Sequence, residues 1–119
     1  MNQTNFLVKT IVKGLQEKKG HDIVIVDLRE IQGAICQYMV ICEGNNPNQI
    51  TSLSDSVGEA VRRDLKEKPV SVHGLRNAQW VGIDYSSVLV HIFLSDTRSF
   101  YRLENLWEDS KMKRIPDLD

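Results

Sequence analysis

The chain has 119 residues, of which 41% are hydrophobic and 26% charged, and 15 Lys and Arg against 16 Asp and Glu give a formal net charge of -1. This length predicts one domain spanning residues 1–119, and the composition excludes a disordered or collagen-like chain. The charge balance argues against a surface that holds nucleic acid mainly through phosphate contacts. The sequence contains neither an apolar run of about 20 residues nor a secretory signal pattern, so we expect a cytoplasmic protein without membrane contact.

The N-terminal part of the chain predicts one helix followed by two strands. Apolar residues recur at helical spacing from Phe6 to Leu15, which predicts a helix over about residues 3–19 with Gly20 at its C′ position. The β-branched run Ile23–Val26 is typical of a strand buried on both faces. A second apolar run, at 38–42, predicts the next strand.

A second helix is predicted from its N-terminal residues. Asn46 suits the N-cap, Pro47 suits the first helical position, and Gln49 stands three residues after the cap as in a capping box. Apolar residues then keep to one face until the helix ends before Pro69. The charged pair Arg62–Arg63 lies mostly on the other face and is interpreted as solvated.

The rest of the chain predicts three strands, at 70–73, 80–85 and 88–94. The helical spacing of Phe100, Leu103, Leu106 and Trp107 predicts a last helix, and a polar tail follows from about residue 110. The resulting order is α-β-β-α-β-β-β-α. It predicts an α/β (α+β) fold in which one mixed sheet of about five strands is covered by helices mainly on one face.

The last predicted hairpin has two faces of different chemistry. If Ser86 and Ser87 form a two-residue loop, period two gives one face that is nearly all aliphatic and suits a floor for the helices: Val81, Ile83, Tyr85, Val88, Val90 and Ile92. The other face carries Trp80, Gly82, Asp84, Leu89, His91 and Phe93.

The second of these faces, with its aromatic rings and few polar groups, is typical of a protein-docking surface. The alternative is that Trp80 and Phe93 pack under the terminal helix and Asp84 pairs with His91. Both interpretations remain open from the residues alone.

The sequence offers little for catalysis or metal binding. Cys36 and Cys42 would lie about 20 Å apart on one extended segment, too far for a disulfide, so both thiols are predicted to be buried. The histidines form no paired-ligand motif, so we expect no metal and no cofactor. Asp84 and His91 could form a base dyad, but no Ser or Cys nucleophile is placed beside them, and a structural role is the simpler interpretation.

Several segments in a specific order resemble the ribosomal silencing factor family, also called RsfS or Iojap-like proteins. They are Asp22–Arg29, Tyr38–Asn45 continuing to Gln49, Gly74–Leu75 with Trp80–Tyr85, Val88–Phe93 and Arg98–Trp107. The resemblance covers about residues 5–110. Two departures are Gln37-Tyr38-Met39, where relatives commonly have Asp-Tyr-Phe, and Ser86, where relatives commonly have glycine.

The resemblance implies a small fold related to nucleotidyltransferases but without their catalytic carboxylates. It also implies binding to the large ribosomal subunit through ribosomal protein fourteen of that subunit, which hinders joining with the small subunit and represses translation when nutrients are scarce. Carried onto this chain, the family's Trp-containing strand places Trp80, Asp84 and Tyr85 at the interface, with His91 beside them.

The implied protein is therefore a binding factor and not an enzyme, acting as a monomer or weak homodimer, with a contact to ribosomal RNA also open. A nucleotidyltransferase-type enzyme and an RNA-binding module are the competing functions. The absence of a paired Asp-x-Asp after Gly44 disfavours the enzyme, and the net charge disfavours the RNA-binding module.

Overall fold

The computed structural model describes residues 3–101 and 111–118, and its elements follow one another along the chain as three helices and six strands. They are α1 (Gln3–Glu17), β1 (His21–Asp27), β2 (Tyr38–Gly44), α2 (Pro47–Leu65), β3 (Ser71–His73), β4 (Trp80–Asp84), β5 (Val88–Leu94), α3 (Ser95–Tyr101) and β6 (Lys111–Ile115). The predicted helices and strands up to β5 are all present, with ends shifted by a few residues.

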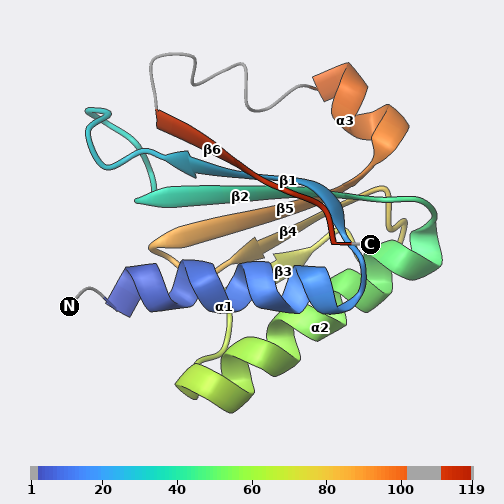
Figure 1. Ribbon diagram of the computed structural model, residues 1–119, viewed down its shortest axis with the longest axis horizontal. Coiled ribbons are helices and arrows are strands. Elements are labelled where there is room, and N and C mark those ends of the chain that lie inside the picture. The colour runs from blue at the N-terminus through green and yellow to red at the C-terminus, as the bar shows by residue number, and fades with distance from the viewer. Residues whose placement is uncertain (1–2, 102–110, 119) are drawn as a thin grey trace.

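The described strands form one sheet in the order β3-β4-β5-β2-β1-β6. β2 and β5 run parallel and the other neighbours run antiparallel, so the sheet is mixed as predicted. The α/β (α+β) class is confirmed. Figure 1 shows α1 and α2 side by side on one face of the sheet, with α3 beyond the other face.

The expected polar tail is wrong over residues 111–115, because this segment is a sixth strand. β6 pairs antiparallel with β1, from Ile23 opposite Ile115 to Asp27 opposite Lys111. Its sequence, KMKRI, carries little apolar signal. Pairing with the free edge of β1 determines its conformation. The expected last helix is described only as far as Tyr101, and Leu103, Leu106 and Trp107 lie outside the described residues.

The capping residues of α2 act as the sequence predicts. The Asn46 side chain accepts a hydrogen bond from the Gln49 N–H at 2.8 Å, and Pro47 begins the helix. Gln49 accepts a return bond from the N–H of Asn45, one residue before the cap, at 2.6 Å. Its amide also donates to the carbonyls of Lys18 and Lys19 at 3.1 and 3.2 Å. A local capping pattern thus also fastens the start of α2 to the end of α1.

The prediction of Gly20 as the C′ residue of α1 needs correction. Lys19 adopts the left-handed conformation, with φ +58°. Gly20 instead permits close packing, because an added Cβ would lie 2.5 Å from the Cys42 sulfur and 3.0 Å from Leu53. Glycine is required here by the neighbouring strand and helix rather than by its own backbone angle.

The sheet separates two clusters of buried side chains. The larger lies between the sheet and the helices α1 and α2, and it includes Ile11, Leu53, Val57 and Ile92. The smaller lies on the opposite face and includes Val24, Val26, Ile41 and Phe93. β1 contributes to both clusters, which confirms the prediction of a strand buried on its two faces. Both cysteines are free and buried, also as predicted.

Among the described helices, none is both long and apolar enough to cross a lipid bilayer.

Candidate functional site

The β4–β5 hairpin has the register that the sequence predicts. Trp80 lies opposite Phe93, Gly82 opposite His91 and Asp84 opposite Leu89. The Tyr85 N–H donates to the Val88 carbonyl at 2.9 Å, which confirms a two-residue loop. Ser86 in this loop has φ +72°, in the region that favours glycine. The Asp84 carboxylate accepts the Ser86 N–H at 2.7 Å and so stabilises the turn.

Three rings form a cluster on the face of the hairpin that points away from α1 and α2. The Trp80 indole N–H donates to Nδ1 of His91 at 2.9 Å. The ring centroids of Trp80 and Phe93 lie 4.9 Å apart. Phe93 is fully buried, whereas Trp80 and His91 are half-buried. The cluster is therefore fixed from below by Phe93 and reaches the surface through Trp80 and His91.

The hydrogen bond from Trp80 determines the ionisation state of His91. A ring nitrogen that accepts an N–H must be unprotonated, so the proton of the neutral imidazole is on Nε2. Burial lowers the pKa of His91 to about 4, which favours the same neutral form. At neutral pH this face therefore presents an uncharged imidazole beside the Asp84 carboxylate.

The structure does not pair Asp84 with His91. The Asp84 carboxylate bonds to the turn at Ser86, while His91 Nδ1 is occupied by Trp80. The alternative in which these two side chains satisfy one another is therefore wrong, and the same geometry gives no support to a base dyad. Asp84 is half-buried, and only Oδ1 of its two carboxylate oxygens accepts the hydrogen bond from the turn.

A groove of about 470 Å³ lies over this face of the hairpin. We call it the hairpin groove, and its lining includes Ser71, His73, Trp80, Asp84, Leu89 and His91. Ser71 and His73 could not be assigned to this groove from the sequence, because their place beside Trp80 depends on the pairing of β3 with β4. Exposed Ile35, from the connection between β1 and β2, also lines the groove and could not be assigned to it for the same kind of reason.

Two glycines shape the hairpin groove. Gly82 lies opposite His91 in the middle of the face, and an added Cβ would meet only the imidazole, at 3.9 Å. The missing side chain therefore leaves open space above the strand. Gly74, with φ +92°, sits so close to the chain that an added Cβ would lie 2.0 Å from the Trp80 carbonyl oxygen. Gly74 thus sets the position of the Trp80 backbone.

Tyr85 does not join the other predicted interface residues. Period two turns it to the helix side of the sheet, where it belongs to the larger buried cluster and is 7% exposed. Its hydroxyl is buried without a hydrogen-bond partner among the described residues. Burial raises the pKa of Tyr85 to about 12. The structure brings together Trp80, Asp84 and His91 on the hairpin groove and places Tyr85 behind them.

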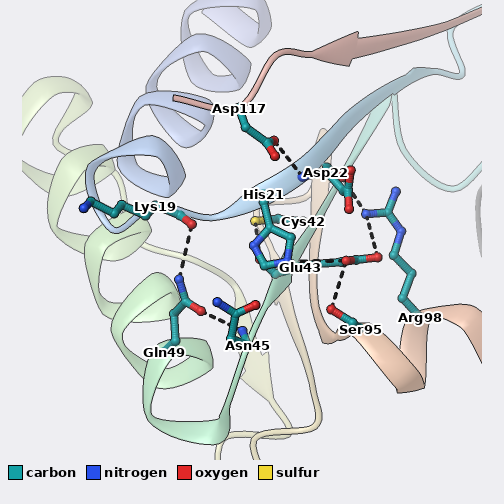
Figure 2. Close-up of polar contacts among 10 residues, drawn as sticks. All are labelled: Lys19, His21, Asp22, Cys42, Glu43, Asn45, Gln49, Ser95, Arg98 and Asp117. Carbon is teal, nitrogen blue, oxygen red and sulfur yellow. Dashed lines mark hydrogen bonds and ion pairs between the residues drawn. The ribbon is translucent and has the colours of Figure 1, made fainter. Parts of the chain in front are cut away.

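A second group of polar side chains, for which the sequence carries no motif, gathers where β1 begins and β2 ends (Figure 2). We call it the polar cluster: His21, Asp22, Glu43, Ser95 and Arg98. His21 Nε2 lies 3.5 Å from Glu43, Ser95 donates to Glu43 at 3.0 Å, and Arg98 donates to the Asp22 carbonyl at 2.5 Å. Antiparallel pairing of β1 with β2 and parallel pairing of β2 with β5 bring these residues together.

The polar cluster is the place where a metal ion would find ligands, because His21, Asp22 and Glu43 each offer an atom within 4.8 Å of the others. Arg98, only 5% exposed, already lies 3.5 Å from Glu43. Burial raises the pKa of the Glu43 carboxyl, Ser95 and Arg98 act in the opposite direction, and Asp22 adds to the rise. The guanidinium thus already supplies the positive charge that a cation would bring. We interpret the cluster as a structural link between α3 and the ends of β1 and β2.

Comparison with known proteins gives consistent results across the whole chain. The family model described as "Ribosomal silencing factor during starvation" matches residues 1–119. The ribosomal silencing factor RsfS of Bacillus subtilis is 32% identical over 120 residues, covering 100% of this chain and 96% of the relative. The RsfS of Haemophilus influenzae is also 32% identical, over 85% of this chain and 97% of its own.

Solved structures agree with this match. A crystal structure of a Chromobacterium violaceum protein superposes with a TM-score of 0.81 at 27% identity, covering 87% of this chain and 84% of that one. A crystal structure from Bacillus halodurans gives a TM-score of 0.76 at 26% identity and covers 99% of both chains. The resemblance drawn from the sequence is confirmed: the chain belongs to the ribosomal silencing factor (RsfS) family, whose name is that of a ribosome-silencing regulator of translation and not of an enzyme.

Proposed function

We propose that this protein represses translation by binding the large ribosomal subunit and physically blocking its joining with the small subunit. The contact on the ribosome is ribosomal protein fourteen of the large subunit, and repression operates when nutrients are limiting. The protein acts in the cytoplasm, as a monomer or weak homodimer, and as a stoichiometric factor that carries out no chemical step.

The observation that carries this proposal is the hairpin groove in a member of the ribosomal silencing factor family. Trp80 reaches the surface at its edge while the buried Phe93 ring holds it in place, and Asp84 and His91 lie on the same face. A tryptophan fixed before binding loses little conformational freedom when a partner covers it. Such residues dominate binding energy in protein interfaces.

The polar groups of the groove fit recognition of a folded protein surface. Asp84 offers a carboxylate oxygen, and the neutral His91 offers its Nε2–H. A few placed polar groups among apolar side chains give an interface its orientation as well as its affinity. Tyr85 lies behind this face, so a partner seated in the groove would not reach its hydroxyl directly.

A mechanism without a chemical step also agrees with the contacts of the ionisable side chains in the polar cluster. Asp22 and Glu43 are the carboxylates that lie together in the polar cluster, and Arg98 and His21 are already beside Glu43. We expect no metal-dependent nucleotide incorporation by the purified protein.

The test is a titration of purified large subunits, followed by addition of small subunits and separation on density gradients. We expect the protein to co-sediment with the large subunit in about equal amount and to reduce the joined fraction. Trp80→Ala should weaken binding by about 2 kcal/mol or more while the domain stays folded. Asp84→Asn keeps the oxygen that accepts the turn N–H but removes the charge, so it tests the carboxylate separately from the fold.

Gradients in which saturating protein leaves the joined fraction unchanged would refute the proposed function. If the protein blocks joining but Trp80→Ala and Asp84→Asn both bind like the wild type, the function survives and the assignment of the hairpin groove is wrong. A loss of binding by Trp80→Ala that is accompanied by a strongly lowered Tm would instead show that Trp80 acts through stability.

A further inference from the structure

A groove of about 400 Å³ at the C-terminal end of α2 gathers positive charge. We call it the basic groove, and it is lined by Glu59, Arg62, Arg63, Lys66 and Lys68. Four cations against one carboxylate give these five side chains a formal charge of +3, in a chain whose net charge is -1. The overall balance of the sequence therefore conceals a local basic surface.

Part of this charge is offset by two carboxylates outside the lining of the groove, Asp64 and Glu67, and Asp64 acts electrostatically on both Arg63 and Lys66. Arg63 is engaged, with Asp64 at 3.0 Å and Glu17 at 3.8 Å. For Arg62, Lys66 and Lys68, the described part of the chain holds no carboxylate within ion-pair distance, and all three are exposed. Three cations thus face solvent along one groove.

The helix dipole accounts for only part of this arrangement. Cations in the last turn of a helix compensate its partial negative charge, which amounts to about half an elementary charge. The backbone carbonyl of Arg62, in the last turn, already accepts the N–H of the cap residue Lys66 at 3.1 Å, and Lys68 lies beyond the end of the helix. The positive charge in the groove therefore exceeds what the end of the helix requires.

We propose that the basic groove binds the phosphate backbone of RNA, as a second anchor of the protein on the large subunit. Arg62 lies in the last turn of α2, Lys66 is the C-cap residue and Lys68 follows the cap, and all three line the same groove, so the positive charge is spread along it. Cations spread along a groove suit a linear polyanion, and arginine matches phosphate oxygens with two parallel N–H donors. The inference rests on the proposed function, because the ribosome supplies such RNA next to a bound protein.

The basic groove and the hairpin groove are connected through β3. Glu59 and Arg62 also line a smaller hollow together with Val72 and Leu75. Ser71 and His73, the residues on either side of Val72, line the hairpin groove. A partner surface made of protein and adjacent RNA can therefore contact both grooves across this short edge strand, with protein over the hairpin and phosphates along the end of α2.

The probe is a fluorescein-labelled RNA hairpin, titrated with the full chain while anisotropy is recorded from about 50 to about 200 mM salt. Three phosphate contacts predict a slope of log K against log salt of about -2 to -3. The double variant Arg62→Glu, Lys66→Glu should weaken RNA binding at least tenfold. The matched control Lys111→Glu, Lys113→Glu makes the same change in net charge on β6, the opposite edge of the sheet, and should reduce it much less.

Two results with the RNA hairpin would overturn the inference: no binding above background, or an equal loss of affinity in the two double variants. Equally tight binding of a labelled polyglutamate peptide would also overturn it, because an acidic protein segment would then be the better occupant. Binding of large subunits separates this inference from the proposed function. Trp80→Ala should lose affinity for subunits and keep affinity for the RNA hairpin, whereas Arg62→Glu, Lys66→Glu should lose both. A charge variant that binds subunits and RNA like the wild type refutes the second anchor alone.

Discussion

Gly82 provides the most direct test of the hairpin groove, because it allows the groove to be filled without disturbing the fold. An added Cβ would meet only the His91 ring at 3.9 and 4.0 Å, which is ordinary van der Waals contact. In Gly82→Val the two further methyl groups project from β4 into the space above the strand. Valine is also favoured in strands, where glycine costs about 0.5–1 kcal/mol relative to alanine.

We therefore expect Gly82→Val to leave the free energy of unfolding unchanged or to raise it by about 0.5–1 kcal/mol. A partner surface that fits the open groove would clash with the methyl groups, and affinity for the large subunit should fall at least tenfold, or about 1.4 kcal/mol. The two effects have opposite sign, so loss of binding cannot be explained by loss of folded protein. Gly82→Ala should give a smaller loss of affinity.

The measurements are urea unfolding and co-sedimentation with large subunits, performed on the same preparations. Gly58→Ala serves as the control, because an added Cβ on this α2 glycine would meet nothing within 4 Å. It should stabilise the helix by about 0.5–1 kcal/mol and leave subunit binding intact. Wild-type affinity in a folded Gly82→Val protein would refute the assignment of the hairpin groove as the docking surface.

Three further outcomes follow from the same region. Gly74→Ala should lower the free energy of unfolding by about 1–3 kcal/mol, measured by urea denaturation, because its Cβ would overlap the Trp80 carbonyl and its φ is +92°. His91 has a pKa of about 4 in the folded protein against an ordinary 6.5, so the unfolded chain takes up the proton first as the pH falls. The free energy of unfolding should therefore fall, by at most about 3 kcal/mol, as the pH drops from 6.5 to 4. Thermal melts across this pH range should show a smaller fall for His91→Gln. Tyr85→Phe should raise the free energy of unfolding in urea by about 1 kcal/mol, because it removes a buried hydroxyl that has no partner among the described residues. It should leave subunit binding unchanged. Reduced binding by a stable variant would show that Tyr85 contributes to the interface.

Local chemistry in the sequence was sufficient for the elements whose geometry depends on near neighbours. The start of α2 was predicted from Asn46, Pro47 and Gln49, because a cap is formed within one turn of the chain. The hairpin register followed from a two-residue loop and period two, and it held even though Ser86 occupies a position that favours glycine. The same alternation already separated Tyr85 from Trp80 and Asp84.

Tertiary structure decided the features that depend on which distant segments meet. β6 has a polar sequence and is a strand because β1 offers it a free edge. The polar cluster exists because two strand pairings bring His21 and Ser95 to Glu43. The hairpin groove needs β3 beside β4, and the basic groove appears only when charges are placed in space, since a net charge of -1 says nothing about where 15 cations lie. Sequence patterns report contacts over a few residues, whereas sites formed across the sheet depend on its strand order.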